Sequence, residues 1–247
     1  MTARVHFDFT GTAALVTGGT SGIGHATAVL FREAGAEVTV TGTRPAAADY
    51  ETDLTGIRYR QLVLTDENSI AALVADIGSI DILINNAGAN FPGGLDERTP
   101  DGFDASVLLN LNGTYRLTHM LRGKLAASTA TGGASVVNLA SMAALRAVPV
   151  VPGYGAAKAG IIGLTRNLAV TWVEDGIRVN AVAPGTILTP MTAPMPPATA
   201  AAEVAHIPVG RFGTAEEIAP TIAFLCTAQS AYTTGSVFVV DGASDCL

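Results

Sequence analysis

The sequence predicts an α/β fold in which a doubly wound, seven-stranded parallel sheet carries helices on both faces. Short runs rich in β-branched residues alternate with longer stretches of helical pattern along the chain. Most of the short runs are continuously apolar, which is typical of parallel strands that are covered on both faces. No internal repeat and no linker-like segment divides the sequence. We therefore expect a single domain over residues 1–247.

The order of the elements follows the alternation that right-handed crossovers between parallel strands require. Strands are predicted at 13–17, 37–41, 58–64, 81–85, 134–140, 177–183 and 236–242. Helices are predicted at 23–34, 67–76, 101–127, 155–174 and 215–228. Residues 42–57 lack an apolar stripe and are predicted to form a loop or a single turn. Residues 186–206 contain four prolines, which keep them out of the sheet interior, and we expect them to form a lid-like cover.

The composition limits the classes of function. Hydrophobic residues make up 49% and charged residues 14% of the chain, and the net charge is −7. An acidic protein is repelled by phosphate-rich partners, so we expect no nucleic-acid and no membrane partner. The first residues lack the pattern of a secretory signal, and no apolar run reaches the ~20 residues that span a bilayer. The two cysteines and four histidines match no metal motif, so we expect a cytoplasmic protein without a metal.

The first predicted strand runs directly into "TGGTSGIG" at 17–24, which opens the first predicted helix. Glycines allow a positive φ and the close approach of a diphosphate. The free N–H groups and the dipole at a helix N-terminus favour the anion. The spacing differs from G-x-G-x-x-G, and a purely structural turn is the alternative. The position between strand and helix predicts a nucleotide-binding turn.

The end of the second predicted strand bears on the choice of nucleotide. In such folds a carboxylate at this point binds the ribose 2′-hydroxyl, whereas an arginine accepts a 2′-phosphate. Here the strand runs into Gly42, Thr43 and Arg44, without a carboxylate. The pattern favours NADP(H), with NAD(H) as the second choice, and a solvated loop arginine is the alternative.

A tyrosine and a lysine lie four residues apart in "YGAAK", as Tyr154 and Lys158. On a helix the two share one face, and an ammonium beside a phenol lowers the phenol pKa. Such a pair exchanges a proton near neutral pH, although a tyrosine at a helix start with a solvent-reaching lysine is the alternative. Ser141 ends the fifth predicted strand, at the sheet edge where ligands bind, and a serine there also suits a helix cap.

Together these motifs resemble the classical short-chain dehydrogenase/reductase family over nearly the whole chain, and in particular its 3-oxoacyl-[acyl-carrier-protein] reductase-like members. The matching features, in order, are "TGGTSGIG", "NNAG", "LNLNG", Ser141 with "YGAAK", "RVNAVAPG", "GRFGTAEEIA" and "VDG". The resemblance implies a Rossmann-type sheet and a nicotinamide cofactor.

The resemblance also implies roles for individual residues. Tyr154 would be the general acid/base, Ser141 would orient the carbonyl, and Lys158 would hold the nicotinamide ribose and lower the tyrosine pKa. Asn110, or else its neighbour Asn112, would support a water that leads to the lysine. The implied cofactor-binding residues are Gly18, Thr20, Ser21, Gly22, Ile23, Gly24, Thr43, Arg44, Asn86, Ala87, Gly88, Tyr154, Lys158, Pro184, Gly185, Ile187 and Thr189.

Two positions depart from the family pattern. An aspartate that touches adenine in relatives aligns with Val63, so this contact is not expected here, and Asp66 is predicted to cap a helix instead. The family's closing "DGG" is "DGA" at 241–243, which we predict to be a variant of the same turn.

We therefore expect an enzyme that interconverts a carbonyl and a secondary alcohol by hydride transfer with NAD(P)(H). A non-catalytic NADP(H)-sensing protein would be expected to lose Tyr154 or Lys158. A sugar-nucleotide epimerase or dehydratase would need a larger carboxyl-terminal domain.

Reduction of 3-oxoacyl groups on an acidic carrier protein is the closer alternative, and it calls for basic residues at the site entrance. The stretches "AASTATGGAS" and "TWVEDG" offer none, while Met191, Met195 and the prolines of 186–206 suit an apolar ligand. We therefore favour a free small or medium apolar substrate. The remaining candidates for a docking patch are Arg116, Arg122, Lys124 and Arg146.

The helix predicted to begin near Tyr154 is rich in glycine and alanine, which allow a partner helix to approach closely. Relatives pair through this helix and the one before it. We expect a homotetramer, with a dimer as the second choice.

Overall fold

The computed structural model describes residues 5–246, and these contain the seven-stranded parallel sheet that the sequence predicts. The strands run in the order β3-β2-β1-β4-β5-β6-β7. Their bounds are Ala13–Val16 (β1), Glu37–Gly42 (β2), Arg58–Gln61 (β3), Ile82–Asn85 (β4), Ala134–Leu139 (β5), Ile177–Pro184 (β6) and Val237–Val240 (β7). The chain reverses its direction of winding between β1 and β4, the point at which parallel sheets bind ligands beyond their carboxyl ends.

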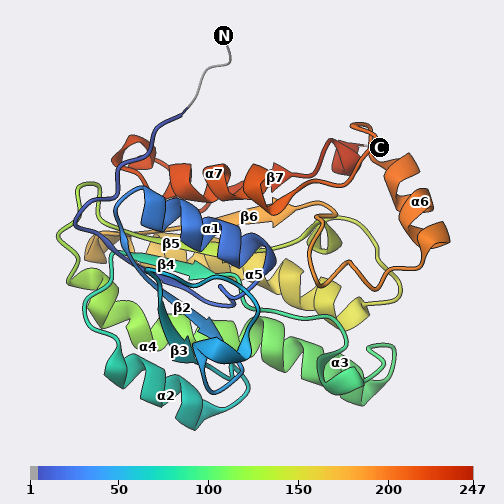
Figure 1. Cartoon of the computed structure of the whole chain (residues 1–247), viewed down its shortest axis with the longest axis horizontal. Coiled ribbons are helices and arrows are strands. Elements are labelled where there is room, and N and C mark those ends of the chain that lie inside the picture. Colours follow the sequence, from blue (N-terminus) through green and yellow to red (C-terminus); the bar gives the residue numbers. More distant parts are fainter. Residues whose placement is uncertain (1–4, 247) are drawn as a thin grey trace.

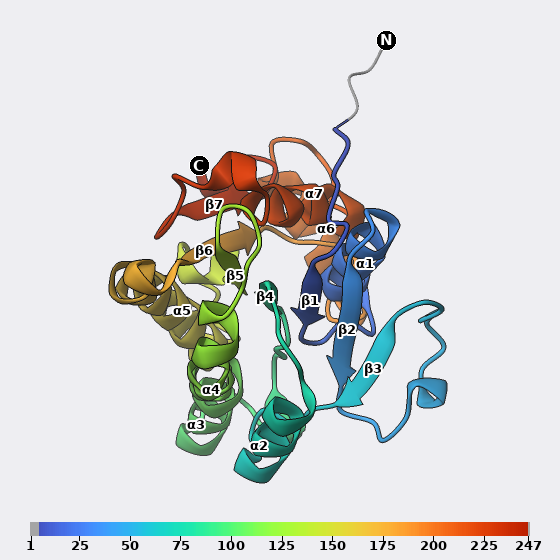
Figure 2. The ribbon, with the colours of Figure 1, turned by 90° about the vertical axis from the view of Figure 1, so that its left-hand side faces the viewer.

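Helices cover both faces of the sheet (Figure 1). Their bounds are Gly22–Glu33 (α1), Glu67–Asp76 (α2), Pro100–Val107 (α3), Thr114–Ala126 (α4), Pro152–Thr171 (α5), Pro197–His206 (α6) and Ala215–Leu225 (α7). Figure 2 shows α1 and α7 on one side of the sheet and α2, α4 and α5 on the other. Successive strand residues divide accordingly: Val16 packs in the α1–α7 core and Leu15 in the α2–α4 core.

The predicted helix at 101–127 is not continuous, because a π-helical turn at Leu108–Gly113 separates α3 from α4. Gly113 lies in this turn so close to the preceding β-strand connection that a Cβ there would stand 2.3 Å from the carbonyl oxygen of Leu64. The apolar pattern of "LLNLNG" continues that of the flanking helices, so sequence periodicity does not reveal the turn.

The prediction was correct for one of the two segments without a clear pattern, 42–57, and incomplete for the other, 186–206. Residues 42–57 form a loop with only the short turn Ala47–Asp49, as predicted. Within 186–206 the structure adds α6, which no sequence pattern had indicated, because none of its residues is buried. Asp66 caps α2 by accepting a hydrogen bond from the Asn68 N–H at 2.9 Å, as predicted. Ala243 has a φ of 70° in the "DGA" turn, a conformation that glycine adopts without strain.

Arg178 explains part of the "RVNAVAPG" motif in structural terms. Its buried guanidinium donates hydrogen bonds to the backbone carbonyls of Gly132, Leu225, Ser230 and Thr233. The residue thus fastens the start of β6 to the end of α7.

In the described part of the chain, no helix is long and apolar enough to cross a bilayer. No group of three or more histidine, cysteine or acidic side chains within residues 5–246 is arranged to hold a metal.

Candidate active site

The glycine-rich connection between β1 and α1 is a turn that only small residues can form. Gly18 and Gly22 have φ values of 64° and 52°, in the left-handed region. A Cβ on Gly18 would stand 2.9 Å from the Cα of Ala87, and one on Gly24 would stand 2.4 Å from the Gly18 carbonyl oxygen. Ser21 precedes α1 with no side-chain cap on the helix. The turn therefore presents the N-terminus of α1 to an anion at the sheet's switch point.

The "NNAG" motif is bonded directly to this turn. The Thr17 hydroxyl accepts hydrogen bonds from the N–H groups of Asn86 and Ala87, both at 3.0 Å. The Asn86 side chain in turn donates two hydrogen bonds from Nδ2, to the carbonyl oxygens of Thr17 at 2.9 Å and Gly18 at 3.1 Å. A Cβ on Gly88 would stand 2.6 Å from Asn110 Oδ1 and 3.6 Å from Lys158 Nζ. The two motifs thus form one rigid wall that extends to the lysine.

Asn110 lies in the π-helical turn and is fully buried, whereas Asn112 is exposed. Its Oδ1 accepts from the Ala89 N–H at 3.0 Å, and its Nδ2 donates to the carbonyl oxygens of Ala89 at 3.0 Å and Ser106 at 2.9 Å. The structure therefore brings Asn110, and not Asn112, to the site. Its side-chain groups hold the backbone at Ala89.

Ser141, Tyr154 and Lys158 meet beyond the end of β5. Lys158 is 4% exposed, its Nζ donates to the Leu139 carbonyl oxygen at 2.5 Å, and it lies 5.5 Å from the centre of the Tyr154 ring. The Ser141 hydroxyl accepts from the Ala143 N–H at 3.1 Å, so it also caps the short turn that follows. The cap predicted for Ser141 is therefore present, and its role toward a carbonyl oxygen stays a prediction.

The pKa of Tyr154 differs from the expectation. Burial raises it to about 12, although a hydrogen bond from Ser141 acts in the lowering direction. Burial also lowers the pKa of Lys158, to about 8. Desolvation, which disfavours both charged forms, is the largest cause of each shift, and the expected lowering of the tyrosine pKa by the ammonium is not among the causes. The phenol is protonated at neutral pH.

The segment after β6 closes the other side of the turn. A Cβ on Gly185 would stand 2.7 Å from the Cα of Asp241, so Pro184 leads directly into a tight crossing beside β7. Ile187 is buried and forms a bridge to Gly213. The Thr189 side chain faces the glycine-rich turn, because its Cγ2 would stand 3.0 Å from a Cβ on Gly22.

The segment 186–206 also meets the loop that follows Ser141. Glu203 of α6 forms an ion pair with Arg146, and it accepts a hydrogen bond from Thr186 Oγ1 at 2.8 Å. The paired side chains of Arg146 and Glu203 are only 22% and 23% exposed. This cluster ties α6 to the loop that carries Ser141.

At the adenosine end, sequence reasoning missed Tyr50. A Cβ on Gly42 would stand 2.3 Å from the Tyr50 hydroxyl, which accepts a hydrogen bond from the Arg44 N–H at 2.9 Å. The Arg44 guanidinium stacks over the Tyr50 ring at 4.9 Å. Thr43 and Arg44 are exposed. Tyr50 thus occupies the space that a carboxylate at position 42 would need, and it holds Arg44 at the sheet edge.

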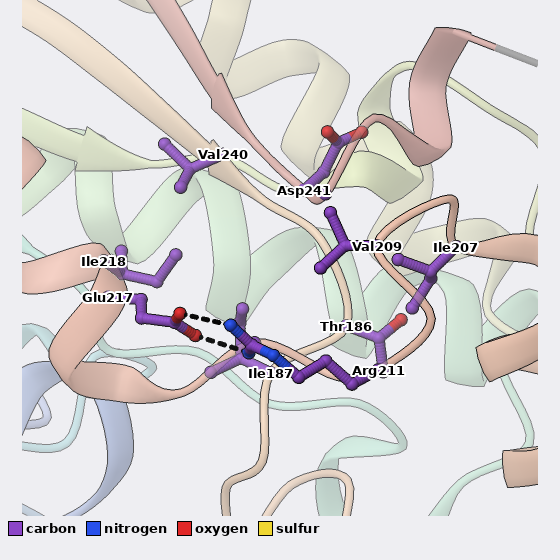
Figure 3. A pocket seen from close by; sticks show the side chains of 11 residues that line it. Thr186, Ile187, Ile207, Val209, Arg211, Glu217, Ile218, Val240 and Asp241 are labelled. Atoms are coloured by element: carbon purple, nitrogen blue, oxygen red, sulfur yellow. Dashed lines mark hydrogen bonds and ion pairs between the residues drawn. The ribbon is translucent and has the colours of Figure 1, made fainter.

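Two cavities adjoin the site. One, of about 180 Å³, lies between the ends of β6 and β7 and the Ile207–Gly213 segment, and the Arg211–Glu217 ion pair closes one side (Figure 3). Ser141, Tyr154 and Lys158 are not among its lining residues. The other, an open hollow of about 340 Å³, is lined by Phe91, Gly94, Leu95, Asp96, Arg98 and Val150, and again by none of the three.

These features fit a nicotinamide nucleotide. The glycine cradle, the helix N-terminus and the buried lysine lie along one edge, from Arg44 to Tyr154. Within residues 5–246, the Oδ1 atoms of Asn85 and Asn90 are buried and without a hydrogen-bond partner. Buried oxygens are rarely left unsatisfied, and Asn90 follows "NNAG" at the point where the nicotinamide half would lie.

Comparison with known proteins identifies the family. A family model described as enoyl-(acyl carrier protein) reductase matches residues 18–243. The 3-oxoacyl-[acyl-carrier-protein] reductase FabG of Thermotoga maritima is 36% identical over 241 residues, covering 94% of this chain and 97% of that protein. The chain belongs to the short-chain dehydrogenase/reductase family. It is accordingly an oxidoreductase that interconverts carbonyl and alcohol groups with a nicotinamide cofactor.

Other members of this family are about equally similar. The cis-4-hydroxycyclohexanecarboxylate dehydrogenase of Sinomonas cyclohexanicum is 37% identical over 243 residues, covering 93% of this chain and 94% of that protein. A solved structure described as the Pseudomonas aeruginosa RhlG/NADP active-site complex superposes with a TM-score of 0.87 at 30% identity, covering 98% of this chain and all of that one. Family membership thus establishes the reaction class, while these relatives differ in their named substrates.

Proposed function

We propose that the protein is an NADP(H)-dependent oxidoreductase of free, small or medium apolar ketones and secondary alcohols. The observation that carries this proposal is the convergence of Ser141, Tyr154 and Lys158 at the end of β5, on the wall formed by "NNAG" and the glycine-rich turn. Every group needed to bind a carbonyl oxygen and give it a proton lies within this cluster.

The residues divide the work by their chemistry. Bound in its reduced form, the nicotinamide supplies a hydride to the carbonyl carbon. Ser141 donates a hydrogen bond to the carbonyl oxygen, and the Tyr154 phenol, protonated at neutral pH, delivers its proton to that oxygen as negative charge develops there. Lys158, whose pKa burial lowers to about 8, stabilises the tyrosinate that results. In the oxidation direction Tyr154 must first lose its proton, so alkaline pH favours that direction.

The preference for NADP(H) rests on the Arg44–Tyr50 pair. Arg44 is the exposed cation at the end of β2, and Tyr50 fills the position of the carboxylate that would repel a 2′-phosphate. An arginine guanidinium is well suited to phosphate because it is planar and always charged. Tyr50 holds this guanidinium in place.

Pairing of the surface arginines supports a free substrate. Each candidate for a docking patch is already engaged: Arg116 with Glu67 at 3.0 Å, Arg122 with Asp175 at 2.6 Å, Arg146 with Glu203, and Lys124 with the Ile77 carbonyl oxygen at 2.5 Å. The three arginines that are paired with carboxylates present little net field to an acidic carrier protein, whereas Lys124 keeps its charge. Phe91, Leu95 and Val150 form the apolar part of the 340 Å³ cavity and would contact a hydrocarbon substituent on the substrate. Segment 186–206 would cover this substrate as a lid that the Arg146–Glu203 pair holds closed.

Substrate choice is tested with matched pairs of ketones. We expect a panel of free cyclic and medium-chain ketones, followed by nicotinamide absorbance, to include one whose kcat/KM equals or exceeds that of a 3-oxoacyl chain on its carrier protein. A carrier-bound chain that is better by about tenfold or more, corresponding to about 1.4 kcal/mol, would contradict the proposal. The same acyl chain on a short thiol distinguishes recognition of the chain from recognition of the carrier.

We also propose a homotetramer in a reducing compartment such as the cytoplasm. Tyr115 and Met120 on α4, and Val170 and Val173 at and after the end of α5, are exposed apolar side chains, and Gly163 leaves open space on α5. The two cysteines, Cys226 and Cys246, are free thiols, which suits a reducing environment.

Light scattering at micromolar concentration should therefore give the mass of four chains. A Val170→Glu substitution, which places a charge on the proposed contact face, should lower that mass. A dimeric mass would support the second choice, a dimer. A strictly monomeric wild-type protein would refute the proposed assembly.

A further inference from the structure

Glu97 is a buried carboxylate that the family resemblance did not single out. Its side chain is inside the protein, with 1% of the residue exposed. Gly102 of α3 lies against the adjacent backbone, since a Cβ there would stand 2.0 Å from the Asp96 carbonyl oxygen. A Cβ on Gly153 of α5 would stand 3.0 Å from the Cα of Phe103. Glu97 thus occupies a slot between the starts of α3 and α5. A buried charge at such a place needs partners.

Both carboxylate oxygens have a partner, and the two partners belong to different functional elements. Oε2 accepts the N–H of Tyr154 at 2.7 Å, and Oε1 accepts the N–H of Phe91 at 2.9 Å. Tyr154 is the third residue of α5, and Val151, which precedes the helix, provides no side-chain cap. Glu97 therefore supplies the cap of α5 from another part of the chain, where the helix dipole stabilises a negative charge.

The second partner is strained. Phe91 has φ 49° and ψ 54°, a left-handed conformation that is strained for a residue other than glycine. Such conformations persist where the surroundings over-determine them. Glu97 accepts a hydrogen bond from the Phe91 N–H, and the Phe91 side chain lines the 340 Å³ cavity.

We propose that Glu97 is a positioning residue that fixes the Tyr154 end of α5 to the loop at Phe91, so that one carboxylate sets both the proton donor and the side chain that we propose to contact the apolar part of the substrate. The inference rests on the proposed function of the site. Tyr154 approaches the substrate oxygen correctly only if the first turn of α5 is fixed, and Phe91 limits where the substrate lies. The carboxylate also acts on the phenol through its charge, because Glu97 raises the pKa of Tyr154.

The cations near Glu97 are bonded to other groups and do not neutralise the effect of its charge on the Tyr154 pKa. Asp96 and Arg98 in the same loop pair with each other at 2.7 Å, and Asp101 and Asp104 of α3 are exposed. Lys158 of α5 bonds to the Leu139 carbonyl oxygen, and Arg146 in the loop after Ser141 pairs with Glu203. Among residues 5–246, no lysine or arginine forms an ion pair with Glu97.

The test is Glu97→Gln, which keeps the shape of the side chain. One of the two carboxylate oxygens becomes an NH₂ group, and this donor must then face the N–H of Phe91 or of Tyr154. We expect kcat to fall about tenfold or more, as the cost of a mispaired buried group indicates. We also expect the pH at which the oxidation rate is half-maximal to move to lower pH by roughly half a unit or more, because a nearby negative charge is lost. Asp104→Asn, which removes an exposed carboxylate of α3 that lines neither cavity, should leave both quantities unchanged.

A readout that does not need turnover separates this inference from the proposed function. Hydrogen exchange should show faster exchange of the Phe91 and Tyr154 amides in Glu97→Gln than in the wild type, with the β4–β5 amides unchanged. If the substrate panel gives no activity but these amides lose protection, the proposed function fails while the positioning role of Glu97 is supported. If kcat, the pH profile and both amides match the wild type, or match Asp104→Asn, the inference is refuted.

A second variant covers the case in which Glu97→Gln does not fold. Phe91→Gly adopts the left-handed conformation without strain, so it keeps the N–H that Glu97 accepts but removes the strain that the carboxylate holds in place. In a Phe91→Gly background, Glu97→Gln should fold and cost less in kcat than in the wild-type background, while still moving the pH profile. Equal losses of kcat in the two backgrounds would show that Glu97 does not act through Phe91 and would overturn the inference.

Discussion

Replacement of Tyr154 by phenylalanine should lower turnover by about 10²–10⁴-fold while the cofactor still binds. The substitution keeps the ring beside Lys158 and removes only the hydroxyl. General acid–base groups contribute about this factor when they are correctly placed. Because burial raises the phenol pKa to about 12, the wild-type hydroxyl is protonated at neutral pH and ready to donate. Reduction should therefore lose its proton source completely in the variant.

Steady-state kinetics in the reduction direction and calorimetry of cofactor binding provide the measurement. Tyr232→Phe is the matched control, because that tyrosine is fully exposed and away from the site, and its kinetics should equal those of the wild type. If Tyr154→Phe retained more than about a tenth of wild-type turnover, a smaller loss than proton transfer accounts for, Tyr154 would not be the proton donor.

The second large effect is expected for Arg44→Ala. The wild type should bind NADPH more tightly than NADH, and the substitution should weaken NADPH binding by roughly 10–100-fold, which corresponds to one lost charge-assisted contact of about 1.5–3 kcal/mol. Affinity for NADH should stay the same, because its ribose carries no phosphate. Calorimetry with both cofactors gives the two affinities directly.

A neighbouring arginine provides the control for overall charge. Arg58 is exposed on the adjacent strand β3, and Arg58→Ala should leave the ratio of the two affinities at its wild-type value. Tyr50→Phe should lower that ratio partway, since the phenol accepts the Arg44 N–H. Tighter binding of NADH than of NADPH by the wild type would show that the absence of a carboxylate at position 42 does not decide the choice.

The sheet could be predicted from the sequence because each of its strands is a local signal. A run such as "ILI" at 82–84 is apolar without interruption, as burial on both faces of a parallel sheet requires. The glycine-rich turn and the end of β5 also follow from local order, since a residue after a strand must lie at the sheet's carboxyl edge. Lys158 and Ser141 lie where these rules place them.

The remaining features depend on contacts between distant residues. Glu97 lies in the polar stretch "LDERTPD", which has the composition of a solvated loop, and only the packing of α3 against α5 buries it. The Tyr154 pKa depends on how completely the phenol is desolvated, which spacing to a lysine does not reveal. Helix α6 has no buried face, so no hydrophobic periodicity marks it.

The π-helical turn at Leu108–Gly113 has a consequence for engineering this chain by insertion and deletion. A π turn holds one residue more than an α turn, and here that extra residue sets the rotation of α3 relative to α4. Removing a single codon within this turn would let the two helices fuse into a regular helix and rotate one end by about 100°, the angle per residue of an α-helix. Asn110 would then leave Ala89. Libraries that vary loop length should therefore spare this segment.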